Sequence, residues 1–271
     1  MREKAEMSSL EYWNLRAETF GGRKGMSKAT NGYMPRFIEK LDLREGQSVF
    51  DMGCANGTLA IPLARAGHAV CARDFSPRMI ELLCDRAQAE SLPIDAQVMA
   101  WEDDWEACGI EENSCDVAVA SRSLAVGPDM LPEALAKLDR VAREKVAVTV
   151  SASLAPAYDE RLLKHLGREV PVPRSHVEVI DALAMMGRLP TLGYIPFERP
   201  MRFDNWDMAI LELRNFAGKE ALDAREEALF EAYAVEHFKV EEGEDGATIY
   251  QLDYRLPVAW AFITWPTGEA A

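Results

Sequence analysis

The sequence predicts a doubly wound α/β fold on a mostly parallel sheet of seven strands, with N-terminal helices and a helical cap insertion. From residue 47, short apolar runs alternate with helical patterns, as in parallel strands covered by helices. These runs are almost uniformly apolar, which indicates strands that are buried on both faces. The chain has 271 residues, 48% of them hydrophobic, which is enough to bury one sizeable core.

Each element of the sheet follows in order. The expected strands are 47–52, 68–73, 95–100, 115–120 and 145–151. Helical spacing of apolar residues predicts helices between them, at 58–66, 76–89 and 131–142. Two further helices, 8–19 and 34–41, precede the sheet, and the glycine-rich segment GGRKG separates them.

The rhythm of strands and helices is lost after the fifth strand. Helical patterns cover 159–166, 177–186, 206–216 and 221–238, and a strand is expected at 191–197. The last two apolar stretches, 248–256 and 258–265, are interpreted as a final antiparallel strand and its hairpin partner. We therefore expect four parts: a helical lid (1–42), a sheet core (43–154), a helical cap that contains the strand 191–197 (155–245) and C-terminal strands (246–271).

Charge and composition exclude several classes of protein. Thirty Lys and Arg against 45 Asp and Glu give a net charge of −15, which repels phosphate backbones and anionic lipids. The sequence has no run of about 18 apolar residues, and with its charged start, MREKAE, we expect neither secretion nor a membrane span. Five cysteines without a CxxC pair suggest neither a disulfide framework nor a zinc site. We expect a cytoplasmic protein with a small-molecule substrate and with neither nucleic acid nor a membrane as partner.

The most informative stretch is VFDMGCANGTLAIPLARAG, where a strand ends at Asp51 and a glycine-rich turn opens a helix. Glycines let the backbone approach a ligand closely, and a helix N-terminus offers N–H donors. The dinucleotide fingerprint G-x-G-x-x-G is missing, because Ala55 stands at its second glycine. An acidic residue two positions before Gly53 suits a ligand with an ammonium group better than one with a pyrophosphate.

In these residues the sequence resembles the class I S-adenosylmethionine-dependent methyltransferases, which have a Rossmann-like fold and a first motif acidic-x-Gly-x-Gly-x-Gly. Asp51, Gly53 and Gly57 match, and Ala55 replaces the middle glycine. The stretch HAVCARDFSPRMIELL is similar to the family's second strand, and its Asp74 follows Asp51 by 23 residues. Its two carboxylate oxygens suit both ribose hydroxyls. The implied cofactor is S-adenosyl-L-methionine, with S-adenosyl-L-homocysteine as product.

The resemblance covers the chain from about residue 10 to about residue 150 and implies a full cofactor site. Glu102 or Asp103 would accept from the adenine amino group while Trp101 packs on the ring; alternatively, the acidic loop is solvated. Tyr12 and Trp13 resemble a segment that covers the cofactor, or else anchor a terminal helix. The implied cofactor residues are Tyr12, Trp13, Asp51, Gly53, Cys54, Ala55, Gly57, Asp74, Phe75, Trp101, Glu102, Asp103 and Ser121.

Two residues are candidates for catalysis on the acceptor side. Arg122, just beyond the fourth strand, can fork onto a carboxylate or pair with the acidic surface. His176, like His165 at the edge of the cap, acts either as a general base or as a helix cap. No H-x-H or H-E-x-x-H pattern supports a metal site, so none is expected. The cysteines are interpreted as small buried residues.

These observations predict an enzyme, a methyltransferase that transfers a methyl group to a small-molecule acceptor by in-line displacement. The acceptor is expected to be anionic and to lie between Arg122 and the cap near His176. One alternative is a non-catalytic or regulatory protein that binds S-adenosylmethionine with the same fold. The other alternative is a nicotinamide oxidoreductase, which the missing G-x-G-x-x-G fingerprint disfavours. The acceptor atom, the need for a base, the role of the cap and the oligomeric state stay open.

Overall fold

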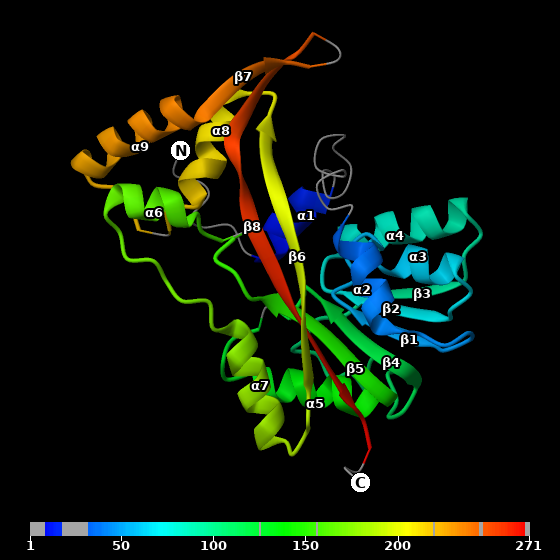
Figure 1. Cartoon of the computed structure of the whole chain (residues 1–271). Coiled ribbons are helices and arrows are strands. Elements are labelled where there is room, and N and C mark those ends of the chain that lie inside the picture. The colour runs from blue at the N-terminus through cyan, green and yellow to red at the C-terminus, as the bar shows by residue number, and fades with distance from the viewer. Residues whose placement is uncertain are drawn as a thin grey trace. The chain divides into compact units, whose positions relative to one another are not determined.

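The computed structural model of the chain describes residues 9–17, 32–124, 126–155, 157–218, 220–243 and 246–268. Its strands form one sheet in the order β3-β2-β1-β4-β5-β8-β6, and an eighth strand, β7, pairs with β8 (Figure 1). The doubly wound, mostly parallel α/β fold is thus confirmed. The chain divides into two compact units: Met1–Val150 with His176–Gly193 and Ala261–Ala271, and Ser151–Ser175 with Tyr194–Trp260.

Five strands of the first unit set the position of the candidate site. They are β1 (Val49–Met52), β2 (Val70–Asp74), β3 (Ile94–Val98), β4 (Cys115–Ser121) and β5 (Ala142–Ser151). β1 pairs in parallel with both β2 and β4, β2 pairs with β3, and β4 pairs with β5. Parallel strands end at a common edge, so the residues after β1, β2 and β4 lie close together.

One expectation for these strands is wrong. The strand at 95–100 was expected to be buried on both faces, but Val98 of β3 is 51% exposed. The sheet order explains the difference, because β3 is the edge strand and pairs only with β2. An edge strand keeps water on one side whatever its composition.

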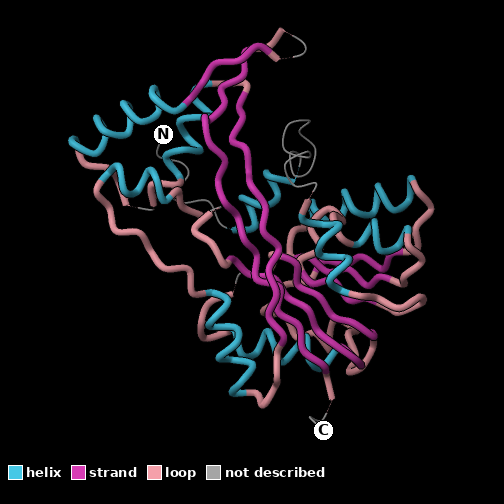
Figure 2. The backbone as a smooth tube through the Cα atoms, in the orientation of Figure 1, coloured by secondary structure: helices cyan, strands magenta, loops and turns pink. Residues whose placement is uncertain are grey.

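Helices cover both faces of this parallel sheet. The first unit contains α1 (Ser9–Ala17), α2 (Tyr33–Leu41), α3 (Ala60–Arg65), α4 (Pro77–Ala89), α5 (Leu131–Val141) and most of α7 (Ser175–Met185). α3 and α4 pack on β2 and β3, whereas α5 packs on β4 (Figure 2). Right-handed crossovers that run in opposite directions along a sheet leave it on opposite faces. The carboxyl ends of the strands between these two sets of helices are where a ligand can bind.

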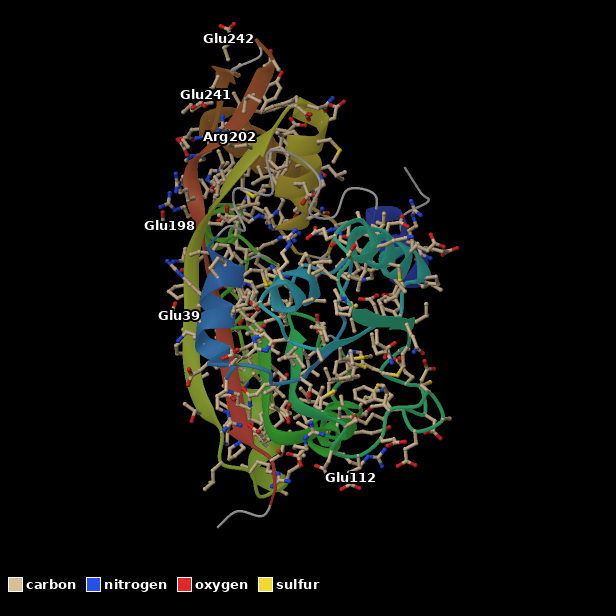
Figure 3. The ribbon with its side chains drawn as sticks, turned by 90° about the vertical axis from the view of Figure 1, so that its right-hand side faces the viewer. Glu39, Glu112, Glu198, Arg202, Glu241 and Glu242 are labelled. Carbon is tan, nitrogen blue, oxygen red and sulfur yellow. The ribbon has the colours of Figure 1, made fainter. Side chains whose placement is uncertain are left out.

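The second unit consists of helices packed on the ends of long strands. Its elements are α6 (Glu160–Leu166), α8 (Trp206–Asn215), α9 (Ala224–His237), β7 (Phe238–Glu242) and parts of β6 (Thr191–Phe203) and β8 (Thr248–Pro266). Leu213, Phe230 and Leu252 belong to its buried core. The strands also carry charged side chains; Arg202 Nη2 on β6 lies 3.7 Å from Glu241 Oε2 on β7 (Figure 3).

The end of the chain differs from the sequence prediction. The expected strand and hairpin partner at 248–256 and 258–265 are one continuous strand, β8. Pro257 suggests a break, but proline imposes an extended-compatible φ and removes only a single N–H donor. One antiparallel partner of β8 is β7, which starts at Phe238, the residue that the sequence places at the end of a helix.

Candidate cofactor site at the carboxyl ends of the strands

The turn after β1 is built from left-handed backbone. Gly53 and Gly57 have φ of +76° and +84°, and Ala55 has φ of +49°. A Cβ on Gly53 would lie 2.2 Å from Cβ of Ser123, and a Cβ on Gly57 would lie 2.4 Å from Cδ1 of Leu83. Both glycines are therefore required by packing within the protein. A side chain at Gly57 would strike Leu83 of α4.

Asp51 places a buried carboxylate at the end of β1. Its side chain is 1% exposed, and its Oδ2 has no hydrogen-bond partner in the described part of the chain. Burial, and then the charge of Asp74, raise the pKa of Asp51 from 3.8 to about 7. A buried and unpaired carboxylate is costly for a fold, so its presence indicates a missing partner. A ligand ammonium group is such a partner.

Asp74, at the end of the neighbouring strand β2, is held by the backbone. Its Oδ2 accepts a hydrogen bond from the Ala55 N–H and its Oδ1 accepts one from the Ser76 N–H, both at 2.9 Å. Burial raises the pKa of Asp74, while these two bonds lower it. Each oxygen of a carboxylate has a further lone pair. Asp74 therefore fixes the turn after β1 and can still accept ligand hydroxyls.

The residues after β3 form a local turn. Trp101 Nε1 donates to the Ser123 carbonyl at 3.1 Å, and the rings of Trp101 and Trp105 lie 5.5 Å apart. Asp103 Oδ2 accepts from the Ala100 N–H at 2.8 Å, whereas the Glu102 side chain is exposed. Of the two candidates for the adenine contact, Asp103 thus already stabilises the turn, whereas Glu102 extends into solvent.

Helix α1 is anchored on the start of α4. Ser76 Oγ accepts from the Met79 N–H as the N-cap of α4 and donates to Asn14 Oδ1 at 2.6 Å. Asn14 and Ser76 were not predicted, although Ser76 before Pro77 has the pattern of a helix start. Tyr12 is 43% exposed and is no core anchor; its ring meets that of Trp13 edge to face.

The remaining cofactor candidates are less informative. Cys54 is buried, and burial raises the pKa of its thiol well above the usual range. Phe75 is half-buried. Cys84 is exposed, so the expectation that all cysteines are buried is wrong; the buried stripe of α4 runs through Met79, Ile80, Leu83 and Ala87.

A polar cluster lies at the ends of β4 and β5. The Tyr33 hydroxyl on α2 lies 2.6 Å from Thr149 Oγ1 and 3.0 Å from Ser121 Oγ. The Arg122 guanidinium lies over the Tyr33 ring at 4.2 Å, and its backbone N–H donates to Thr149 Oγ1 at 3.0 Å. Sequence reasoning found Ser121 and Arg122 but missed Tyr33 and Thr149. The signal for Thr149 was a polar residue in the otherwise apolar run KVAVTVS.

The two cap histidines lie on different helices. His176 occupies the first turn of α7, and its Nδ1 is buried. His165 lies on α6 with Nε2 3.2 Å from the Leu229 carbonyl, which gives it a structural contact in the second unit. Within the described ranges, no three His, Cys, Asp or Glu side chains are grouped to hold a metal ion. None of the helices described there is long and apolar enough to cross a membrane.

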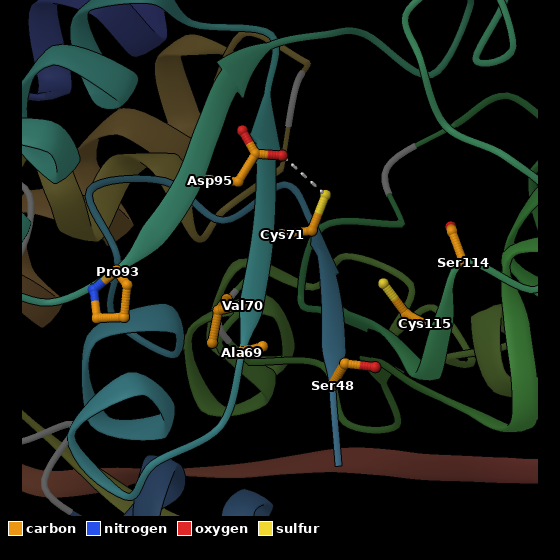
Figure 4. Close-up of a pocket in the computed structure, with 8 residues that line it drawn as sticks. All are labelled: Ser48, Ala69, Val70, Cys71, Pro93, Asp95, Ser114 and Cys115. Carbon is orange, nitrogen blue, oxygen red and sulfur yellow. Dashed lines mark hydrogen bonds between the residues drawn. The ribbon is translucent and has the colours of Figure 1, made fainter. Parts of the chain in front are cut away.

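A pocket of about 280 Å³ lies on the other edge of the sheet (Figure 4). Four of its lining residues directly precede strands: Ser48, Ala69, Pro93 and Ser114 come before β1, β2, β3 and β4. It is thus an amino-edge pocket and is separate from the strand ends that carry Asp51 and Asp74.

Comparison with known proteins agrees with this geometry. Residues 49–145 match the family model described as "Methyltransferase domain". An uncharacterized protein of Haemophilus influenzae is 28% identical over 169 residues, which cover 62% of this chain and 60% of that protein. The chain thus spans less than two thirds of the length of this relative.

Two solved structures share the fold. Magnesium protoporphyrin IX methyltransferase from Synechocystis with bound S-adenosylhomocysteine superposes with a TM-score of 0.54 at 13% identity, covering 96% of this chain and 98% of that one. The [4+2]-cyclase SpnF superposes with a TM-score of 0.58 at 14% identity, covering 96% and 95%. The motif residues Asp51, Gly53, Gly57 and Asp74 all lie in or beside the turn after β1, within the segment 49–145 that matches the methyltransferase-domain model.

Proposed function

We propose that the protein is a methyltransferase that transfers the methyl group of S-adenosyl-L-methionine to a small-molecule acceptor. The observation that carries the proposal is the buried carboxylate of Asp51, whose Oδ2 is unpaired in the described part of the chain, beside Asp74 at the next strand end. A fold tolerates such a carboxylate when a bound cation compensates it. The amino group of the cofactor supplies that cation.

The other residues of the strand ends complete the cofactor site in this proposal. Asp74 accepts the ribose hydroxyls with the lone pairs that Ala55 and Ser76 leave. Trp101 packs on the adenine, and Glu102 accepts from its amino group. The first part of the chain (1–42) acts as a lid through α1, with Tyr12 and Trp13 over the cofactor. The glycines that we propose as its hinge, Gly21, Gly22 and Gly25 of the segment GGRKG, lie outside the described residues.

The bound cofactor supplies a methyl group that its sulfonium already activates. The protein then has to align the acceptor and exclude water, so a dedicated catalytic triad is unnecessary. Arg122 binds a carboxylate of the acceptor, and His176 takes up the proton where the acceptor loses one. We further propose a cytoplasmic location, because the five cysteines suggest no disulfide framework. The net charge of −15 supports a partner that is neither nucleic acid nor membrane.

A second function on the same fold is binding of the cofactor without methyl transfer. SpnF has a similar fold and is described as a [4+2]-cyclase, so the fold alone does not define the reaction. This likeness is the reason to retain the alternative of cofactor binding without methyl transfer. The test is incubation with methyl-labelled S-adenosyl-L-methionine and fractionated small metabolites. Labelled product that forms with the wild type and is lost with Asp51→Asn supports transfer. Cofactor binding without a labelled product in any fraction supports the alternative.

A further inference from the structure

Arg122 is held in an unusual conformation by two residues that the cofactor site does not use. Its φ of +60° lies in the left-handed region, which costs a residue with a side chain about 1 kcal/mol or more. The bond from its backbone N–H to Thr149 Oγ1 fixes this conformation. Glycine would fit the backbone there without strain, so the strain points to a use for the arginine side chain.

Tyr33 sets the direction of that side chain. The guanidinium stacks on its ring at 4.2 Å, and the ring is fixed because its hydroxyl bridges Thr149 and Ser121. Register places Ser121 opposite Thr149, so one hydroxyl joins the ends of β4 and β5. Stacking uses the face of a guanidinium, whereas its N–H donors lie in the plane, at the edge. The contact therefore orients the edge that recognises a carboxylate.

The charge of the cluster favours an anion. Burial raises the pKa of the Tyr33 phenol, so it stays neutral, and Ser121 and Thr149 carry no charge. Burial also lowers the pKa of Arg122, so its desolvated cation gains most from a nearby anion. The cluster is next to β1, because β4, which ends at Ser121, pairs with β1.

We propose that Tyr33 is a positioning residue for the acceptor: its ring holds the Arg122 guanidinium so that the N–H edge receives a carboxylate group of the acceptor. The proposal rests on the proposed function, because it concerns the acceptor side of the same site. It assigns a role to Tyr33 and Thr149 in the contact between Arg122 and the acceptor carboxylate.

The test follows the Nε–Hε signal of Arg122 by NMR in arginine-labelled protein saturated with S-adenosyl-L-homocysteine. The signal is assigned by its loss in Arg122→Lys, and acetate and benzoate serve as carboxylate probes. In the wild type, the ring of Tyr33 should shift the signal upfield, and the probes should move it further. Tyr33→Phe keeps the ring but loses the hydroxyl that fixes it, so it should retain the upfield shift and only part of the probe binding. Tyr33→Leu should lose the upfield shift and weaken probe binding at least tenfold, as Thr149→Val should in part.

Three outcomes would overturn the inference. An Arg122 signal without an upfield shift in the wild type refutes the stacking and needs no variant, so a misfolded Tyr33→Leu protein does not spoil the test. Probes that leave the wild-type signal unmoved refute the carboxylate site. An unchanged response in Tyr33→Leu, with Tyr194→Leu as a surface control, refutes the role of Tyr33. Failure of S-adenosyl-L-homocysteine to bind at all would instead refute the proposed function.

Discussion

Replacing Asp51 by asparagine should stabilise the cofactor-free protein and weaken cofactor binding at the same time. The pKa of Asp51 is raised from 3.8 to about 7, so the folded state holds a proton that the unfolded state has lost between these values. Stability therefore falls as the pH rises through this window, by at most about 4 kcal/mol. An amide removes the charge but leaves a buried polar group, which costs about 1–3 kcal/mol. We expect a net gain of about 1–3 kcal/mol at about pH 8 and, because the carboxyl is already protonated at about pH 4, a net loss of about 1–3 kcal/mol there.

The measurement is urea unfolding at both pH values, together with calorimetric titration of S-adenosyl-L-homocysteine. Loss of the charge-assisted contact should cost about 1.5–3 kcal/mol, or tenfold or more in affinity. The affinity of the wild type for S-adenosyl-L-homocysteine should also fall about tenfold for each pH unit below about 7, because Asp51 becomes protonated. Asp42→Asn is the matched control, because Asp42 is exposed and its φ of +45° suits asparagine. Lower stability of Asp51→Asn at about pH 8, or the same pH profile as the wild type, would refute the reasoning.

Three further variants test the turn after β1. Asp74→Asn should stay folded and bind S-adenosyl-L-homocysteine at least about tenfold more weakly in calorimetry, and unchanged affinity would place the ribose elsewhere. Gly57→Val should lose more than about 2 kcal/mol of stability in urea unfolding, because its Cβ meets Leu83 Cδ1 at 2.4 Å; a wild-type midpoint would contradict the packing. Ala55→Gly should gain about 0.5–1 kcal/mol by relieving the left-handed φ of +49°, and a loss would show that this turn is unstrained.

The arrangement of the proposed cofactor half of the site was predictable because it depends on local rules. A strand ending at Asp51, a glycine turn and a second strand ending at Asp74 need only the strand period and the geometry of parallel sheets. Asp51 and Asp74 consequently lie at neighbouring strand ends, as expected. The function of Gly57 was harder to infer, because its contact with Leu83 belongs to a helix distant in sequence.

The proposed acceptor half of the site depends on contacts between elements far apart in the chain. Tyr33 and Thr149 are separated by 116 residues, and no periodicity links a helix start to a strand end. The boundary between α9 and β7 was missed because Phe238 fits an apolar helix position and an apolar strand position equally well. Pro257 suggested the break that β8 does not have.

Calorimetric titration of the chain with S-adenosyl-L-homocysteine and, separately, with NAD tests most directly whether the turn after β1 is a methyltransferase cofactor site. We predict saturable binding of S-adenosyl-L-homocysteine that weakens at least about tenfold in Asp51→Asn and in Asp74→Asn, and no binding of NAD. Equal affinity of both variants and the wild type, or binding of NAD in place of S-adenosyl-L-homocysteine, would contradict the assignment of the site.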